Sequence, residues 1–267
     1  MGLLMNYRTL TRYLPHALLL LLLVGLSVGY YQGYRLGRSG IAYPGSILAE
    51  IPLRGSEVYV DQKKITVTAT SSEQVVIDSL PAGKHTVLVG RAGYWPWQKT
   101  IRVPSKGEAL ARPFHVPQNA SGLIITDKDP EYWSTVNAIR REAVPSPEMR
   151  RVSADKSVAI WSDGEGVHAA WLLGANRTPY FFCPESDCTD ILTVYRPKDA
   201  VRSLDFYPGR ADVIILAMEN GVFALEIDAT GTQNFQPIYK GAKPSFIVSE
   251  FGTLLIEDGG HLFEVAL

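Results

Sequence analysis

Near its N-terminus the chain contains an uncharged stretch from Leu14 to Tyr34, whose centre is a run of leucines. About 20 apolar residues in a helix cross the hydrocarbon core of a bilayer, and a helix satisfies its own backbone hydrogen bonds there. Tyr13 lies before the stretch and three tyrosines lie near its end, as in an interfacial aromatic belt. The pattern predicts a transmembrane helix over residues 14–34.

A cleaved signal peptide is the alternative interpretation of this stretch. Arg8 and Arg12 would form its basic region, and Ser27 and Gly29 would be the small residues of a cleavage site. Both interpretations export the rest of the chain. With the helix retained, the short and mildly basic segment 1–13 is expected in the cytoplasm, with residues 41–267 outside.

Apolar and polar positions alternate in several short runs between residues 54 and 104. The runs cover residues 58–60, 75–77, 85–89 and 97–103, and turn residues such as Pro81-Ala-Gly-Lys84 separate them. A period of two predicts half-buried antiparallel strands. Residues 41–53 hold two prolines and a mixed pattern, which predicts a spacer before this small β domain.

Residues 105–150 predict a connector with one short helix. Asp129 is the expected cap, because an Asp side chain can accept a hydrogen bond from the first turn, and Pro130 suits the first helical position. The apolar residues at helical spacing are Tyr132, Val136, Ile139 and Ala143. We expect this helix to pack on the region that follows it.

A repeat appears from residue 151 onward. Its copies cover residues 151–171, 204–227 and 247–265, and each holds an apolar strand followed by an Asp-Gly or Asn-Gly turn and another strand. The spacings bracket the roughly 40–45 residues of a propeller blade. Residues 151–267 therefore predict about three blade-like units. Closed propellers have about four to eight blades, so we expect open sheet edges. The apolar strand 254–256 would lie at such an edge, with little charge to prevent it from pairing with another chain.

Two family resemblances extend this pattern. Residues Val58-Tyr-Val-Asp61, Leu80-Pro-Ala-Gly-Lys-His-Thr-Val87 and Gly93-Tyr94 resemble a PEGA domain, a small β-sandwich-like module of exported microbial proteins. Ser153-Ala-Asp-Lys-Ser157 is similar to the Ser-Pro-Asp-Gly-Lys motif of TolB-like propellers. The resemblances imply a membrane helix, a PEGA-like sandwich over residues 54–104 and propeller-like repeats over residues 151–267, without catalysis in the PEGA-like part.

Composition narrows the class of function. The formal net charge is −1, so no global positive field is present to attract nucleic acid, and no nucleic-acid partner is expected. The five histidines are scattered, and neither a phosphate-binding loop nor a nucleophile-elbow motif occurs. We therefore expect no enzyme activity, no cofactor and no metal site.

Two groups of residues are candidate sites. Cys183 and Cys188 are the only cysteines, and an exported chain favours a disulfide that closes a surface loop. Free thiols and a redox or metal role are the alternatives. Tyr94, Trp95 and Trp97 could form an exposed aromatic platform for sugar rings or a partner, or could instead fill the core of a small sheet.

The sequence as a whole predicts a mainly β, membrane-anchored binding or scaffold protein of the cell envelope. Its partner would be an envelope protein or a polysaccharide. A carbohydrate- or cell-wall-binding receptor that uses the aromatic stretch is the main alternative, and a degenerate hydrolase built on a propeller is a third.

Overall fold

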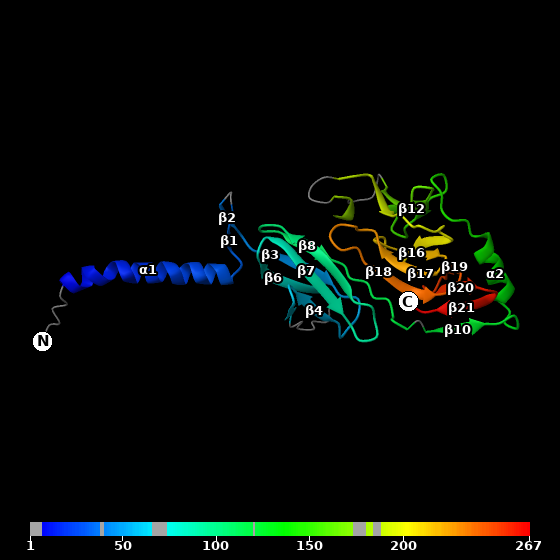
Figure 1. Ribbon diagram of the computed structural model, residues 1–267, viewed down its shortest axis with the longest axis horizontal. Coiled ribbons are helices and arrows are strands. Elements are labelled where there is room, and N and C mark those ends of the chain that lie inside the picture. Colours follow the sequence, from blue (N-terminus) through cyan, green and yellow to red (C-terminus); the bar gives the residue numbers. More distant parts are fainter. Residues whose placement is uncertain (1–6, 38–39, 66–73, 120, 173–179, 184–187) are drawn as a thin grey trace. The chain divides into compact units, whose positions relative to one another are not determined.

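The computed structural model describes residues 7–37, 40–65, 74–119, 121–172, 180–183 and 188–267, and it is mainly β with one long N-terminal helix (Figure 1). The chain divides into two compact units. The first contains Met1–Arg54, Val58–Val87 and Ile101–Pro113, and the second contains Gly55–Glu57, Leu88–Thr100 and Phe114–Leu267. Among the described residues, no sheet closes into a barrel.

Helix α1 (Tyr7–Tyr31) is the N-terminal element, and its 19-residue stretch Tyr13–Tyr31 is long and apolar enough to cross a membrane. A signal sequence would have the same length and composition. The helix ends in a Schellman motif, in which Gly33 has a φ of +90° and the N–H of Tyr34 donates to the carbonyl of Gly29. Glycine suits this position because it adopts a left-handed conformation without strain.

The first unit holds a two-stranded hairpin, a three-stranded sheet and most of a four-stranded sheet. The strands are β1 (Arg35–Gly37) and β2 (Gly40–Ala42) in the hairpin, β3 (Gly45–Glu50), β6 (Gln74–Leu80) and β9 (Glu108–Ala111) in the second, and β4 (Glu57–Val60), β5 (Lys63–Ile65), β7 (Gly83–Gly90) and β8 (Trp97–Val103) in the third. The sheet orders are β6-β3-β9 and β5-β4-β7-β8. The expected alternation is confirmed, because every second residue of β4, β7 and β8 is buried.

The prediction that residues 41–53 form a spacer is wrong. Residues 41–53 contain β3, the central strand of its sheet, which pairs antiparallel with β6 and parallel with β9. Ile47 and Ala49 of β3 have no exposed surface. The flanking prolines concealed this strand, and its partner β9 lies in the expected connector, so neither range is merely a linker.

The second unit contains three four-stranded antiparallel sheets. The first is β11 (Arg151–Val152), β12 (Val158–Ser162), β13 (Val167–Trp171) and β14 (Ile191–Tyr195); the second is β15 (Ser203–Phe206), β16 (Val213–Met218), β17 (Gly221–Glu226) and β18 (Phe235–Lys240); the third is β10 (Gly122–Ile125), β21 (His261–Val265), β20 (Leu254–Asp258) and β19 (Ser245–Val248). The three repeat copies correspond to these three sheets.

The expected open edge at residues 254–256 is wrong. Strand β20 lies between β19 and β21, and Leu254 and Ile256 are fully buried. The outer side of β21 is in turn paired with β10, a strand that precedes the first repeat copy. Gly122 of β10 allows this pairing at close range, because a Cβ atom there would clash with the carbonyl oxygen of Glu264.

Helix α2 (Tyr132–Arg141) packs on the third sheet, as expected. Val136 and Ile139 are buried in one cluster with Ile125 and Leu262. The prediction that Asp129 caps this helix is wrong. The carboxylate of Asp129 instead accepts hydrogen bonds from the N–H and the hydroxyl of Thr126, before the helix begins.

Candidate functional site

The aromatic stretch does not form the exposed platform that Trp97 would have completed. Trp97 lies on β8 with no exposed surface, while Tyr94 and Trp95 are half-buried. The N–H of Trp95 donates to the carbonyl of Val116, and Tyr94 forms a β-bridge with Pro117. Trp97 is therefore a core residue, because a ring without exposed faces cannot stack on a sugar.

His115 lies beside this stretch and is buried. Its ring meets that of Tyr94 edge-on at 6.0 Å between centroids. Burial, with Arg91 and Arg210 nearby, lowers the pKa of His115 to about 4, so the ring is neutral at pH 7. Neither ring nitrogen has a hydrogen-bond partner among the described residues. Burying such an unsatisfied polar group lowers the stability of the folded state.

A buried ionic cluster in the second unit is the most unusual site of the chain. The Nζ atom of Lys99 on β8 lies 3.1 Å from Oε2 of Glu226 and 3.1 Å from Oδ2 of Asp228. It also donates a 2.8 Å hydrogen bond to the carbonyl oxygen of Asp228. All three side chains are at most 5% exposed. One cation therefore lies between two carboxylates in a region closed to water.

Amide side chains surround the cluster and extend its hydrogen bonding. Nδ2 of Asn234 donates to Oε2 of Glu226 and to the carbonyl of Gln98, and the N–H of Gln98 donates to Oδ1 of Asn234. The amide of Gln236 bridges in the same way, since it donates to the carbonyl of Pro96 and accepts from the N–H of Val116. The backbone that precedes Lys99, at Pro96 and Gln98, is thereby held by the side chains of Gln236 and Asn234.

The protonation state of Glu226 reflects its burial. Burial raises the pKa of its carboxyl group, and the charge of Lys99 and the hydrogen bond from Asn234 act in the opposite direction. Its second oxygen, Oε1, has no hydrogen-bond partner among the described residues. A closed cluster of this kind positions the chain and offers no route for a substrate, so we interpret it as structural.

Sequence reasoning missed Lys99, although a signal was present. Lys99 shares its parity on β8 with Trp97 and Ile101, which are both buried. Alternation alone therefore predicts a lysine on the buried face, and a buried lysine requires an anionic partner.

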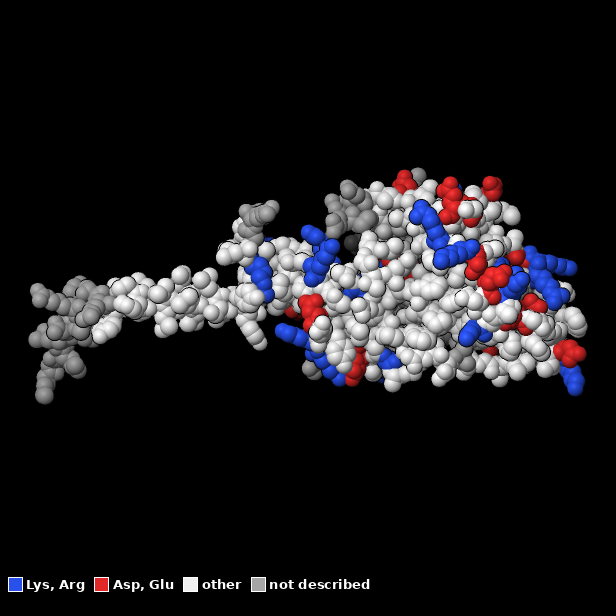
Figure 2. All heavy atoms as spheres, in the orientation of Figure 1, with Lys and Arg blue, Asp and Glu red and all other residues white. Residues whose placement is uncertain are grey.

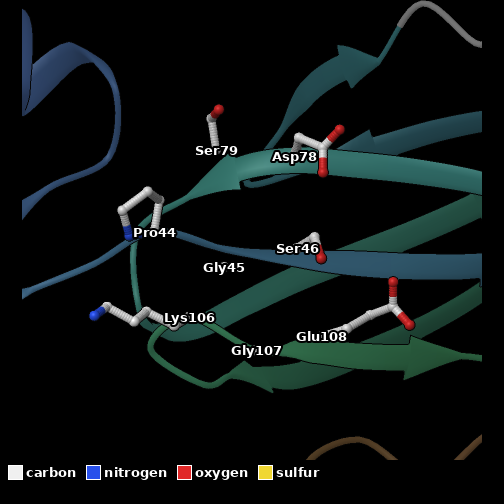
Figure 3. Close-up of a pocket in the computed structure, with 8 residues that line it drawn as sticks. All are labelled: Pro44, Gly45, Ser46, Asp78, Ser79, Lys106, Gly107 and Glu108. Carbon is white, nitrogen blue, oxygen red and sulfur yellow. The ribbon is translucent and has the colours of Figure 1, made fainter.

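The first unit carries a shallow polar depression of about 390 Å³. Figure 3 shows the carboxylates of Asp78 and Glu108 near Ser46, with the side chain of Lys106 directed away from them. Among the described residues, no group of three or more His, Cys, Asp and Glu is placed to hold a metal ion.

Cys183 and Cys188 are joined by a disulfide in the structure. The bond follows the 3₁₀ helix η1 (Tyr180–Phe182), whose Phe181 and Phe182 are buried in the core of the first two sheets of the second unit. The disulfide thus closes a short loop next to a packed anchor.

We expect a non-reduced digest to contain Cys183 and Cys188 in one linked peptide. Replacing both by serine should lower the free energy of unfolding by about 2 kcal/mol, because a six-residue loop removes only modest entropy from the unfolded chain. Mass spectrometry and urea denaturation measure the two effects. Complete alkylation without reductant would contradict the bond.

Comparison with known proteins leaves the family resemblances untested. No protein-family model matches the chain, and no curated protein matches it. The PEGA-like and TolB-like interpretations therefore stay predictions.

Proposed function

We propose that the chain is a membrane-anchored scaffold or binding protein of the cell envelope, with residues 41–267 on the outer side of the membrane. The observation that carries the proposal is helix α1. Its apolar stretch Tyr13–Tyr31 has no buried residues, and the Schellman motif at Gly33 leads directly into strand β1 of the same unit. An apolar helix that no described residue of the chain buries is best accounted for by lipid.

The β part fits a presenting role. A three-stranded and a four-stranded sheet lie in the first part of the β region, which fits a small PEGA-like module, and three four-stranded antiparallel sheets fit propeller-like blades. Strand β10 supplies the outer strand of the last sheet from upstream, which supports a propeller-like arrangement of three units. The disulfide between Cys183 and Cys188 supports the oxidising side of the membrane.

The test is membrane fractionation of the full chain expressed in bacteria. We expect it to stay in the pellet after alkaline carbonate extraction, and protease added to spheroplasts should degrade residues 41–267. A Leu21→Arg, Leu22→Arg variant should lose stable insertion, because each arginine costs about 3 kcal/mol at the centre of a span. A matched Leu21→Ile, Leu22→Ile variant should behave like the unaltered chain.

Four results would contradict the proposal. Release by carbonate would contradict the anchor, and a mature N-terminus near Gly29 would show cleavage as a signal peptide. Full protection in spheroplasts would contradict the orientation. Turnover of ester, peptide or glycoside substrates by the exported region would contradict a non-enzymatic scaffold.

A further inference from the structure

The hairpin that follows helix α1 presents an apolar pair to its surroundings. Leu36 on β1 and Ile41 on β2 are cross-strand partners, and they are 83% and 60% exposed. The two strands form a sheet of their own. An isolated two-stranded hairpin is only marginally stable in water, so an uncovered Leu–Ile pair indicates that a non-aqueous surface contacts it.

The hairpin is tied closely to the end of the helix. The guanidinium group of Arg35 donates hydrogen bonds to the carbonyls of Tyr30 and Tyr34, and it lies 3.8 Å from the centre of the Tyr30 ring. Gly33 is packed so closely that a Cβ atom there would meet the carbonyl oxygen of Ser79 at 2.6 Å. The exposed pair is thereby held a few residues beyond the end of the membrane-spanning stretch.

Aromatic and basic side chains lie next to the hairpin. The rings of Tyr34 and Tyr43 meet edge-on at 5.7 Å, and the ammonium group of Lys106 lies 3.8 Å from the centre of the Tyr43 ring. Lys106 is exposed and directed away from the nearby carboxylates (Figure 3). Figure 2 shows no charged atoms along the described side chains of α1, and basic atoms appear where the hairpin begins.

We infer that strands β1 (Arg35–Gly37) and β2 (Gly40–Ala42) form an interfacial foot, which inserts Leu36 and Ile41 among lipid headgroups and binds anionic phospholipid through Arg35 and Lys106. The inference rests on the proposed membrane anchor. Tyrosines, an apolar pair and cations at the end of a span are the combination that a membrane interface favours. A basic side chain near an anionic bilayer surface adds about fivefold to lipid binding.

The test places a fluorescent label at position 36 of the full chain in nanodiscs of phosphatidylcholine and phosphatidylglycerol. A Leu36→Cys variant in a Cys183→Ser, Cys188→Ser background carries a nitrobenzoxadiazole label, and nitroxide-bearing lipid quenches it. Leu22→Cys, within the span, is the positive control. Val76→Cys on β6 is the matched negative control, because Val76 is an exposed apolar residue of the same unit. We expect quenching at position 36 to exceed that at position 76 several-fold.

The lipid class is tested by placing the nitroxide on one lipid at a time. Nitroxide-bearing phosphatidylglycerol should quench the label at position 36 more strongly than nitroxide-bearing phosphatidylcholine at the same mole fraction. Lys106→Gln should reduce this preference by up to about fivefold, without changing the quenching at position 22. Equal quenching by both lipids would overturn the anionic preference.

The two proposals fail in different ways. If position 22 is quenched and position 36 is quenched no more than position 76, the foot is wrong and the anchor stands. If position 22 is not quenched either, the membrane anchor itself is wrong. Dimerisation of the nanodisc-bound chain that shields position 36 from lipid would also overturn the foot.

Discussion

Replacing Lys99 by methionine should lower the free energy of unfolding of the region 41–267 by about 3–5 kcal/mol. Methionine retains most of the volume of lysine, but it leaves Glu226 and Asp228 without the cation that both carboxylates contact. Breaking a buried ion pair from one side costs this much, because a charge remains in a low-dielectric environment. The loss is a large share of the roughly 5–15 kcal/mol that stabilises a typical domain.

Urea denaturation followed by circular dichroism measures the effect. Lys240→Met is the matched control, because Lys240 ends β18 on the surface, and it should change the stability by less than about 0.5 kcal/mol. Adding Glu226→Gln and Asp228→Asn to Lys99→Met should restore much of the loss, since no uncompensated charge then stays buried. A Lys99→Met variant as stable as the control would show that water reaches the carboxylates.

The loss of unfolding free energy caused by Lys99→Met should also depend on pH. A carboxyl group whose pKa is raised in the folded state stabilises the fold at pH values below its ordinary pKa, which is 4.5 for Glu226. This stabilisation is lost as the pH rises through the pKa of the folded state. Burial raises the pKa of Glu226, and the loss of Lys99 raises it further. The stability that Lys99→Met loses should therefore be largest at neutral pH and should shrink as the pH falls toward 4.5. His115, whose pKa burial lowers to about 4, titrates alike in both proteins and cancels from the difference.

The sequence predicted the elements whose pattern is local. Alternation located β4, β7 and β8, because each has one face buried and one face exposed. The leucine run predicted a long apolar helix, and the helical spacing of Val136 and Ile139 predicted the buried side of α2. In each case a single stretch of chain carries enough information to indicate its own environment.

The elements that sequence reasoning missed depend on distant partners. Strand β9 reads Glu-Ala-Leu-Ala, which favours a strand only weakly, and pairing with β3 decides its structure. Strand β10 is four residues long and is held by β21 at the other end of the repeat region. Lys99 meets its carboxylates across more than a hundred residues of sequence. Nonlocal pairing of this kind leaves almost no trace in a local pattern.

Neither half of the exported region should fold when the chain is divided at residue 104, where alternation ends. Fragment 54–104 lacks β3 and β9, so β6 loses its sheet. Fragment 105–267 lacks Lys99 and the backbone of Gln98 that Asn234 binds, and it therefore buries two carboxylates without a cation. That loss alone is about 3–5 kcal/mol, and the burial of Trp97 is lost with it.

Cooperative unfolding distinguishes the outcomes. The region 41–267 should give one or two sharp urea transitions and dispersed amide resonances, whereas fragments 54–104 and 105–267 should give broad transitions and collapsed resonances. Fragment 88–267 is the matched control for the second unit, because it restores Lys99, Gln98 and Trp97 while leaving out β3, β4 and β6. It should regain a cooperative transition that fragment 105–267 lacks. Equal stability of these two fragments would show that the residues before 105 contribute nothing to the second unit, and the structural role of the Lys99 cluster would be wrong.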